Sequence, residues 1–210
     1  MRLLAATMAL FALALLPSGA RGQDLERGEA LFDLCSQCHE PDGRGAQPLG
    51  APAIAGLDQW YVLSQLQKFR SGGRGRHFDD IEGMRMRPMS MTLASDEDVN
   101  SVAAYVASMP VKQPAPVLTG GDAARGQQLY APCAACHGAK AEGNQAVRGP
   151  ALSRLDDWYL LRQLAKFKTG VRGGNPALDQ DGAVMRGMSS VLANDQAVRD
   201  VVAYIATLSR

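Results

Sequence analysis

The strongest periodic pattern of apolar residues in this 210-residue chain occurs twice. The first occurrence consists of Val99, Val102, Ala103 and Val106. The second consists of Val198, Val201, Val202 and Ile205. Both sets fall at positions i, i+3, i+4 and i+7, which predicts a helix with one buried face. Ser95 with Asp98 forms a capping box before the first helix, and Asn194 is the N-cap candidate for the second.

Weaker signals predict further helices in each half of the chain. Middle helices are expected near residues 60–69 and 158–167, and another helix should precede each of two cysteine pairs. Loops rich in glycine and proline separate these segments. Because no segment alternates apolar and polar residues over the length of a strand, the predicted fold class is all-α.

The second half of the chain repeats the first at a shift of 98 residues, which becomes 99 after one inserted residue. Three prolines within residues 110–116 lie between the copies and favour a stiff, extended connection. We therefore expect an N-terminal domain over residues 23–110, a linker over 111–120 and a C-terminal domain over 121–210.

Residues 1–22 predict export from the cytoplasm. Arg2 is followed by an apolar run over residues 3–16 and then by small residues that suit cleavage after Ala20 or Gly22. This is the pattern of a secretory signal peptide. The apolar run is too short to span a bilayer comfortably, although an uncleaved anchor is the alternative. The expected location of the mature chain is the periplasm.

The four cysteines form two pairs, each followed directly by a histidine. Residues 35–39 (CSQCH) and 133–137 (CAACH) both fit C-x-x-C-H, the pattern for covalent attachment of a c-type haem. Cysteines at this spacing form thioethers at one porphyrin edge and hold the next histidine near the iron. We expect two covalently bound haem c groups, attached through Cys35, Cys38, Cys133 and Cys136, with iron bound by His39 and His137.

Other uses of C-x-x-C fit this chain less well. Zinc sites usually place their two pairs about 15–20 residues apart, whereas 94 residues lie between Cys38 and Cys133. A thioredoxin-like redox pair requires a βαβ context, which the pattern does not predict. A structural disulfide would leave the histidine unexplained in both copies.

The sixth iron ligand follows partly by elimination. His77 is the one histidine outside the motifs, and the second copy has no counterpart, so two bis-histidine haems are excluded. Methionine is the other common axial ligand of cytochromes c. A matched M-R-x-M recurs in both copies. The repeat leaves two pairs of candidates: Met86 with Met185, or Met89 with Met188.

The order of motifs resembles class I cytochromes c. In the first copy it reads C-x-x-C-H, a glycine-rich loop, Pro-Ala, W-Y-x-L-x-Q-L-x-K-F, M-x-x-M-x-x-x-L and S-D-E-D-V-x-x-V-A-A-Y. The tandem form resembles the cytochrome c4 family over essentially the whole mature chain. The resemblance implies two class I cytochrome c domains, each with a few helices around one haem.

This resemblance also bears on the methionine ligands. In the family the axial methionine lies seven residues before the leucine that leads into the last helix, which matches Met86 and Met185. The loop end departs from the family by one extra residue, as Leu-Ala-Ser-Asp and Leu-Ala-Asn-Asp, so Met89 and Met188 remain candidates.

Four other matched pairs have expected roles. Gly28 and Gly126 should let the first and last helices approach closely, opposite Tyr105 and Tyr204. Pro52 and Pro150 resemble the proline that supports the proximal histidine through its neighbouring loop. Trp60 and Trp158 should pack in the core, pack beside a haem or point a polar edge to a propionate. Arg87 and Arg186 should reach a haem propionate or remain solvated.

A haem with both axial positions filled favours electron transfer over catalysis. We therefore expect a non-enzymatic carrier of single electrons. Its donor would be a quinol-oxidising complex or dehydrogenase, its acceptor a terminal oxidase or reductase, and peripheral membrane association is compatible with this role. The alternatives are a cytochrome subunit of a dehydrogenase and a dihaem peroxidase, for which His77 is the one supporting feature. Composition and a net charge of +1 with scattered Lys and Arg exclude nucleic acid as a partner.

The two halves differ in charge. Residues 23–113 contain 9 Lys and Arg against 13 Asp and Glu, whereas residues 114–210 contain 11 against 8. Such a dipole would orient the carrier and make electron exchange sensitive to salt. The expected basic contact with one partner consists of Lys166, Lys168 and Arg172.

The first prediction concerns the mass of the intact protein with its attached haems. Treatment with acid acetone should extract no haem, because thioethers hold both groups, and mass spectrometry should show two haems added to the polypeptide. Extraction of haem, or a mass that corresponds to a single haem, would contradict the assignment.

Overall fold

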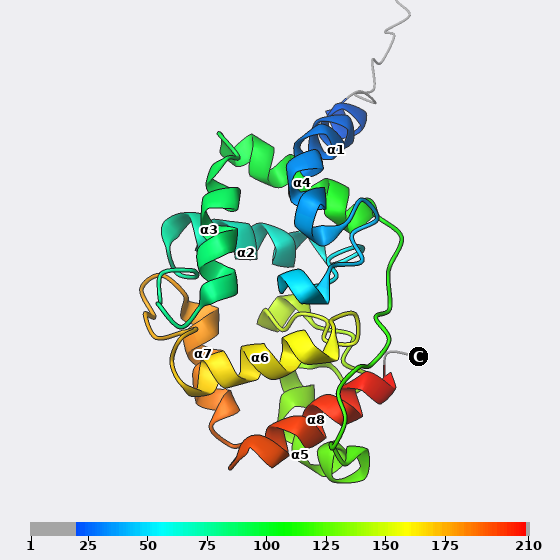
Figure 1. Cartoon of the computed structure of the whole chain (residues 1–210), viewed down its shortest axis with the longest axis vertical. Coiled ribbons are helices and arrows are strands. Elements are labelled where there is room, and N and C mark those ends of the chain that lie inside the picture. Colours follow the sequence, from blue (N-terminus) through cyan, green and yellow to red (C-terminus); the bar gives the residue numbers. More distant parts are fainter. Residues whose placement is uncertain (1–19, 209–210) are drawn as a thin grey trace, which may run out of the picture.

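The computed structural model describes residues 20–208 and consists of helices joined by loops, which confirms the predicted all-α class (Figure 1). The N-terminal half contains α1 (Ala20–His39), η1 (Gln47–Leu49), α2 (Gln59–Ser71), α3 (Ile81–Met91) and α4 (Asp96–Ser108). The C-terminal half contains α5 (Ala123–His137), η2 (Gln145–Val147), α6 (Asp157–Lys168), α7 (Gln180–Ser189) and α8 (Asp195–Leu208). The predicted signal peptide lies outside the described residues, except that the backbone of residues 20–22 begins α1. No helix within residues 20–208 is long and apolar enough to cross a membrane.

The last helix of each half begins and buries its face as predicted. The Ser95 hydroxyl accepts from the Asp98 backbone N–H at 3.1 Å, and the Asp98 carboxylate accepts from Ser95 N at 3.2 Å. Asn194 Oδ1 accepts from Ala197 N at 2.9 Å. All eight residues of the two apolar stripes are buried. These helices therefore form the centre of each half's core.

The methionines lie on short helices that the apolar pattern does not predict. Asp80 caps α3 by accepting from Gly83 N at 3.2 Å, and Asp179 caps α7 by accepting from Gly182 N at 2.9 Å. Pro88 lies inside α3. Because large apolar side chains such as Ile81 on α3 and Val184 on α7 are exposed, these helices have no one-sided apolar stripe.

One glycine in each half sets the crossing of its first and last helices. A Cβ atom on Gly28 would lie 2.2 Å from the Ser101 carbonyl oxygen and 2.7 Å from Tyr105 Cβ. A Cβ atom on Gly126 would likewise lie 2.9 Å from Tyr204 Cβ. Only glycine permits backbones this close, which confirms the close approach predicted opposite the two tyrosines.

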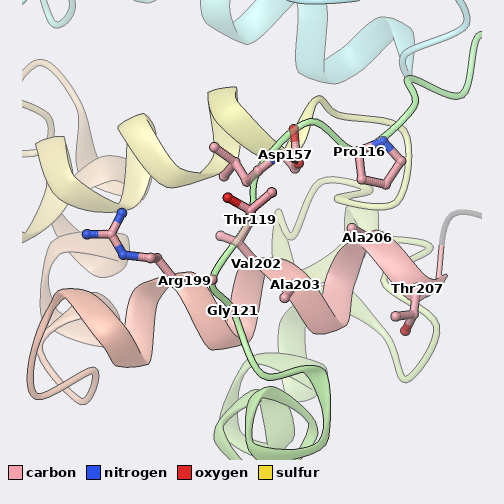
Figure 2. A pocket seen from close by; sticks show the side chains of 11 residues that line it. Pro116, Thr119, Gly121, Asp157, Arg199, Val202, Ala203, Ala206 and Thr207 are labelled. Atoms are coloured by element: carbon pink, nitrogen blue, oxygen red, sulfur yellow. Dashed lines mark hydrogen bonds between the residues drawn. The ribbon is translucent and has the colours of Figure 1, made fainter.

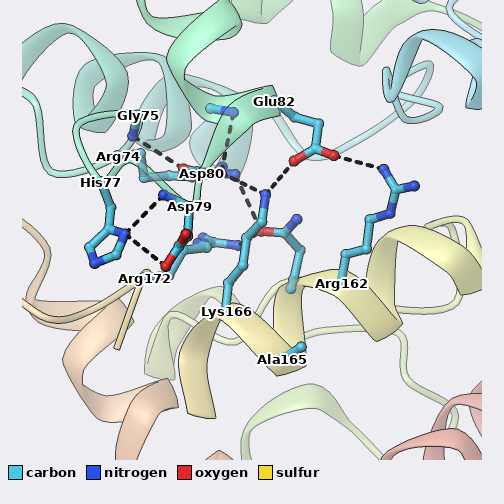
Figure 3. A network of polar contacts seen from close by, with 12 residues as sticks. Arg74, Gly75, His77, Asp79, Asp80, Glu82, Arg162, Ala165, Lys166 and Arg172 are labelled. Atoms are coloured by element: carbon cyan, nitrogen blue, oxygen red, sulfur yellow. Dashed lines mark hydrogen bonds and ion pairs between the residues drawn. The ribbon is translucent and has the colours of Figure 1, made fainter. Parts of the chain in front are cut away.

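The two halves pack against each other through apolar and charged contacts. Leu57 of the N-terminal half is buried within the core cluster of the C-terminal half. Lys166 Nζ on α6 lies 2.6 Å from Asp80 Oδ1 and 2.7 Å from Glu82 Oε2, as Figure 3 shows. The equivalent Lys68 Nζ on α2 lies 2.7 Å from Asp179 Oδ1. The repeat therefore builds a nearly two-fold interface in which each middle helix binds the acidic helix start of the other half.

The predicted basic docking set is wrong. Lys166 is almost buried in the ion pairs of this interface, and Arg172 is buried beside it. Lys168 donates to the Leu192 carbonyl. These charges stabilise contacts within the chain, so they are not available to a redox partner. A sum of charges along the sequence does not show which of them are already paired inside the fold.

The connection between the halves runs along one side of the molecule (Figure 1). One carboxylate oxygen of Asp157, at the start of α6, accepts from the backbone N–H groups of Val117 at 2.8 Å and Leu118 at 2.7 Å. A hollow of about 320 Å³ remains between this connection and α8, and Thr119 and Val202 are among the residues that line it (Figure 2). The linker is thus extended and held at a defined place.

The interface generates a stability prediction. Lys68→Met should lower the free energy of unfolding by about 3–5 kcal/mol, because it leaves the Asp179 carboxylate, which is 0% exposed, without its cation. Lys112→Met is the matched control, since its 3.1 Å pair with Asp42 is about 40% exposed at both ends and should contribute little to the free energy of unfolding. Urea denaturation of the haem-loaded proteins measures both. Equal losses in the two variants would contradict a buried interfacial role for Lys68.

Candidate haem sites

Each half contains a cavity beside its C-x-x-C-H motif. The first is lined by Cys35, Cys38 and His39 from the last turns of α1 and has a volume of about 200 Å³. The second is lined by Cys133, Cys136 and His137 from α5 and has a volume of about 230 Å³. Most of the remaining lining is apolar in both cavities. The helix ends therefore place every predicted attachment residue at a largely apolar cavity.

A proline carbonyl orients the histidine at each site. His39 Nδ1 donates to the Pro52 carbonyl oxygen at 2.8 Å, and His137 Nδ1 donates to the Pro150 carbonyl oxygen at 2.8 Å. This confirms the predicted support from both proline loops. With the hydrogen on Nδ1, Nε2 keeps its lone pair for a metal. Burial lowers the pKa of both histidines, which favours the neutral ring that a metal binds.

The loop that carries the proline depends on a glycine. Gly45 has φ +79°, and a Cβ atom there would lie 2.4 Å from the Pro52 carbonyl carbon. Its N–H donates to the His39 carbonyl at 2.9 Å. Gly143 repeats this arrangement, with φ +88° and a 2.8 Å bond to the His137 carbonyl. A side chain at either glycine would displace the loop from the helix end.

The four cysteines are free thiols in this structure, with no disulfide among them. Burial raises the pKa of Cys35 and Cys133, so these thiols are not activated for redox or metal chemistry. No cluster of three or more His, Cys, Asp or Glu suited to a metal ion occurs in the described part of the chain. These observations leave the zinc and redox-pair alternatives without support.

Both methionine pairs reach the cavities, but they differ in packing. Met86 and Met89 line the first cavity, and Met185 and Met188 line the second. Met86 also packs against the buried core of its half. Met188 is 38% exposed. The structure thus brings both candidate registers to the cavities and buries one of them more deeply.

His77 is not part of either cavity lining. It stacks on the exposed Phe78 at 4.7 Å, and its Nδ1 lies 3.8 Å from a carboxylate oxygen of Asp79 (Figure 3). The feature that would have supported a peroxidase therefore lies at the surface.

Each cavity borrows side chains from the other half of the chain. Trp158 and Tyr159 on α6 line the first cavity, whereas Trp60 and Tyr61 on α2 line the second. Tyr61 and Tyr159 in fact line both, together with Gln163. The tryptophans were predicted to pack in the core or beside a haem. The repeat carries no sign that the haem cavity they contact belongs to the opposite copy.

Two buried arginines line the haem cavities, a role that the sequence did not predict for either of them. Arg74 and Arg172, equivalent in the repeat, line the first and second cavities respectively. Arg172 and Arg74 share the Gln163 and Gln65 side-chain oxygens, at distances of 2.7 to 3.4 Å. Neither forms an ion pair with a carboxylate within the described residues, and both Nε atoms lack a partner. The G-x-R-G sequence in each copy was the available signal.

These arginines test whether a haem fits. A buried guanidinium requires a counter-charge, and haem propionates supply carboxylates of the kind that Arg binds best. Arg87 and Arg186, which were expected either to reach a propionate or to remain solvated, line neither cavity, and Arg186 is exposed. The residues present thus fit a haem in each cavity, where Arg74 and Arg172 would neutralise the propionates.

Comparisons with known proteins agree with this site. The family model for cytochrome c matches residues 25–110 and 123–209. The chain is 30% identical over 199 residues to cytochrome c4 of Azotobacter vinelandii, covering 88% of this chain and 89% of that protein. It is 32% identical to a thiosulfate dehydrogenase electron acceptor of Stutzerimonas stutzeri (strain A1501), covering 84% and 79%. The structure of reduced cytochrome c4 from Pseudomonas stutzeri superposes with a TM-score of 0.66 at 26% identity, covering 86% and 96%.

The chain therefore belongs to the cytochrome c family. Within that family it is a dihaem electron-transfer cytochrome of two tandem domains, similar to cytochrome c4, with two covalently bound haems.

Proposed function

We propose that this chain carries single electrons between redox partners in the periplasm through two His/Met-ligated haems and catalyses no reaction of its own. One observation carries the proposal. Both cavities combine a histidine fixed through Nδ1 with a methionine pair, and no further histidine lines either of them. A peroxidase requires one unlike, open site, whereas the two sites here match.

The proposed attachment and ligands follow the repeat. Cys35 and Cys38 form thioethers to one haem, and Cys133 and Cys136 to the other. The proximal iron ligands are His39 and His137, and the distal ligands are Met86 and Met185. Core packing of Met86, together with the exposure of Met188, supports this register over Met89 and Met188. The proposed domains cover residues 23–110 and 121–210, joined by the linker 111–120.

With both axial positions filled, the bound group supplies outer-sphere electron exchange and a potential raised by the methionine. The chain's own residues orient the histidines, exclude water from the ring faces and neutralise the propionates. Arg74 and Arg172 meet at the interface through shared glutamine contacts. The two haem sites therefore form a relay between one end of the molecule and the other.

The partners are proposed by class. A dehydrogenase or a quinol-oxidising complex donates electrons, and a terminal oxidase or reductase accepts them. Similarity to a protein named for accepting electrons from thiosulfate dehydrogenase supports a dehydrogenase as donor. The same similarity favours a second candidate, in which the chain is a permanent cytochrome subunit of such an enzyme.

Ligation can be tested with volume-conserving variants. Met86→Leu or Met185→Leu should each remove half of the near-infrared sulfur-to-iron charge-transfer band of the oxidised protein, because each removes one thioether ligand. The double variant should remove the band entirely. Absorption spectroscopy at a fixed haem count measures the loss.

The matched controls are Met89→Leu and Met188→Leu, which should leave the band intact. If these two variants lose the band instead, the ligand register is the other one. If no variant changes it, the His/Met assignment fails at both haems.

The two candidate modes of action differ in native size. A free carrier of 22.4 kDa or less should appear as a single small species in the periplasmic fraction under native gel filtration, since its contacts with partners are transient. Its electron exchange should also change with ionic strength. Stoichiometric co-purification with a dehydrogenase would instead establish the subunit role.

A further inference from the structure

Two equivalent aspartates occupy unlike surroundings in the two domains. Asp58 precedes α2 and Asp156 precedes α6, at the same position of the repeat. Neither side chain caps its own helix. Both carboxylates instead contact groups of the opposite domain. Asp156 contacts a backbone N–H, whereas Asp58 contacts an arginine.

Asp156 is buried against the haem site of the N-terminal domain. Its Oδ2 accepts from the backbone N–H of Ala53 at 2.7 Å. No ion pair to Asp156 lies within 4.0 Å among residues 20–208. Burial raises the pKa of Asp156, which reflects the cost of holding this charge without a cation, while the hydrogen bonds oppose that shift.

The peptide that Asp156 contacts also orients the proximal histidine. The Ala53 N–H and the Pro52 C=O belong to one peptide group, and that carbonyl accepts from His39 Nδ1 at 2.8 Å. A continuous chain of hydrogen bonds thus leads from His39 through one peptide to a carboxylate of the other domain.

The C-terminal site has no such chain. Asp58 is 38% exposed, and its carboxylate pairs with Arg154 at 3.4 Å. Arg154 stands where the first copy has Gly56, and it also donates to the Gly56 carbonyl at 2.8 Å. In the described structure the Ala151 N–H, which follows Pro150, donates to no carboxylate. The second site therefore has the hydrogen bond from His137 to the Pro150 carbonyl, but no carboxylate accepts from the N–H of that peptide group.

A charge at one end of a hydrogen-bond chain affects the other end. A carboxylate that accepts from a peptide N–H polarises the peptide and makes its carbonyl a stronger acceptor. A stronger acceptor at Nδ1 makes the imidazole a more basic ligand. A more basic ligand stabilises the oxidised iron over the reduced iron, so the reduction potential falls.

We propose that Asp156 is a positioning residue that lowers the potential of the N-terminal haem relative to the C-terminal haem, through the Pro52–Ala53 peptide and His39. The inference rests on the proposed ligation of that haem by His39. It makes the two haems of a duplicated chain unequal, so that a single electron favours the C-terminal site.

The test compares Asp156→Asn with Asp58→Asn. The asparagine at 156 keeps an oxygen that accepts from Ala53 N–H but removes the charge. It should raise the potential of the N-terminal haem alone and shift the distribution of one electron between the haems on the order of tenfold, or about 59 mV for a one-electron couple. Asp58→Asn, at the equivalent position, should leave the C-terminal potential nearly unchanged because Arg154 already neutralises that carboxylate.

Redox titration followed by NMR measures each haem separately. The resonances are assigned by contacts to Val106 in the first cavity and Ile205 in the second. An unmoved N-terminal potential in Asp156→Asn, or equal shifts at both haems, would overturn the inference. Absence of the near-infrared band from the unmodified protein would overturn the proposed ligation and this inference with it, whereas an intact band with an unmoved potential overturns the inference alone.

A measurement on the unmodified protein keeps the inference testable if the variant does not fold. In the reduced, diamagnetic state the His39 Nδ1 proton should resonate further downfield and exchange more slowly than the His137 Nδ1 proton, because its acceptor is polarised. Equal shifts and equal exchange rates for the two histidines would contradict the proposal.

Discussion

Each middle helix lines the haem cavity of the opposite half as well as its own, and the rest of this structure depends on this contact. Helix α6 supplies Trp158 and Tyr159 to the first cavity, and α2 supplies Trp60 and Tyr61 to the second. Neither domain of about 90 residues encloses its cavity alone, and a domain of that size has only a small hydrophobic core. The covalent haem and the opposite domain together fill and close the cavity of each half.

The charged contacts follow from this arrangement. If each cavity is completed by the other domain, the two domains must hold a fixed orientation, and the reciprocal pairs of Lys68 with Asp179 and Lys166 with Asp80 provide it. Buried pairs of this kind contribute more to specificity of docking than to net stability, because their desolvation is costly. This fixed orientation also places Arg74 and Arg172 at the centre of the interface, where they would neutralise the propionates of a bound haem.

The two copies form a nearly symmetric structure, in which differences between equivalent residues change the surroundings of each cavity. Replacement of a glycine by an arginine, Gly56 in one copy and Arg154 in the other, neutralises one of two equivalent aspartates and leaves the other buried and unpaired. The two cavities consequently share the hydrogen bond from a histidine to a proline carbonyl but differ in whether a carboxylate accepts from the same peptide group.

Local sequence was enough to predict the features that depend on neighbouring residues. The helices of the Val99 and Val198 stripes, their caps and the two C-x-x-C-H haem sites depend on periodicity and short spacing. The proline support of both histidines was implied by the family resemblance. The methionine helices α3 and α7 were not predicted, because half-exposed helices carry no one-sided apolar stripe.

Features that join residues about a hundred positions apart required the tertiary structure. Lys166 looked like a surface charge until the fold placed it against Asp80, and Asp156 looked equivalent to Asp58 until it reached Ala53. The repeat shows which residues correspond between the copies, but only packing between the copies determines what each one touches.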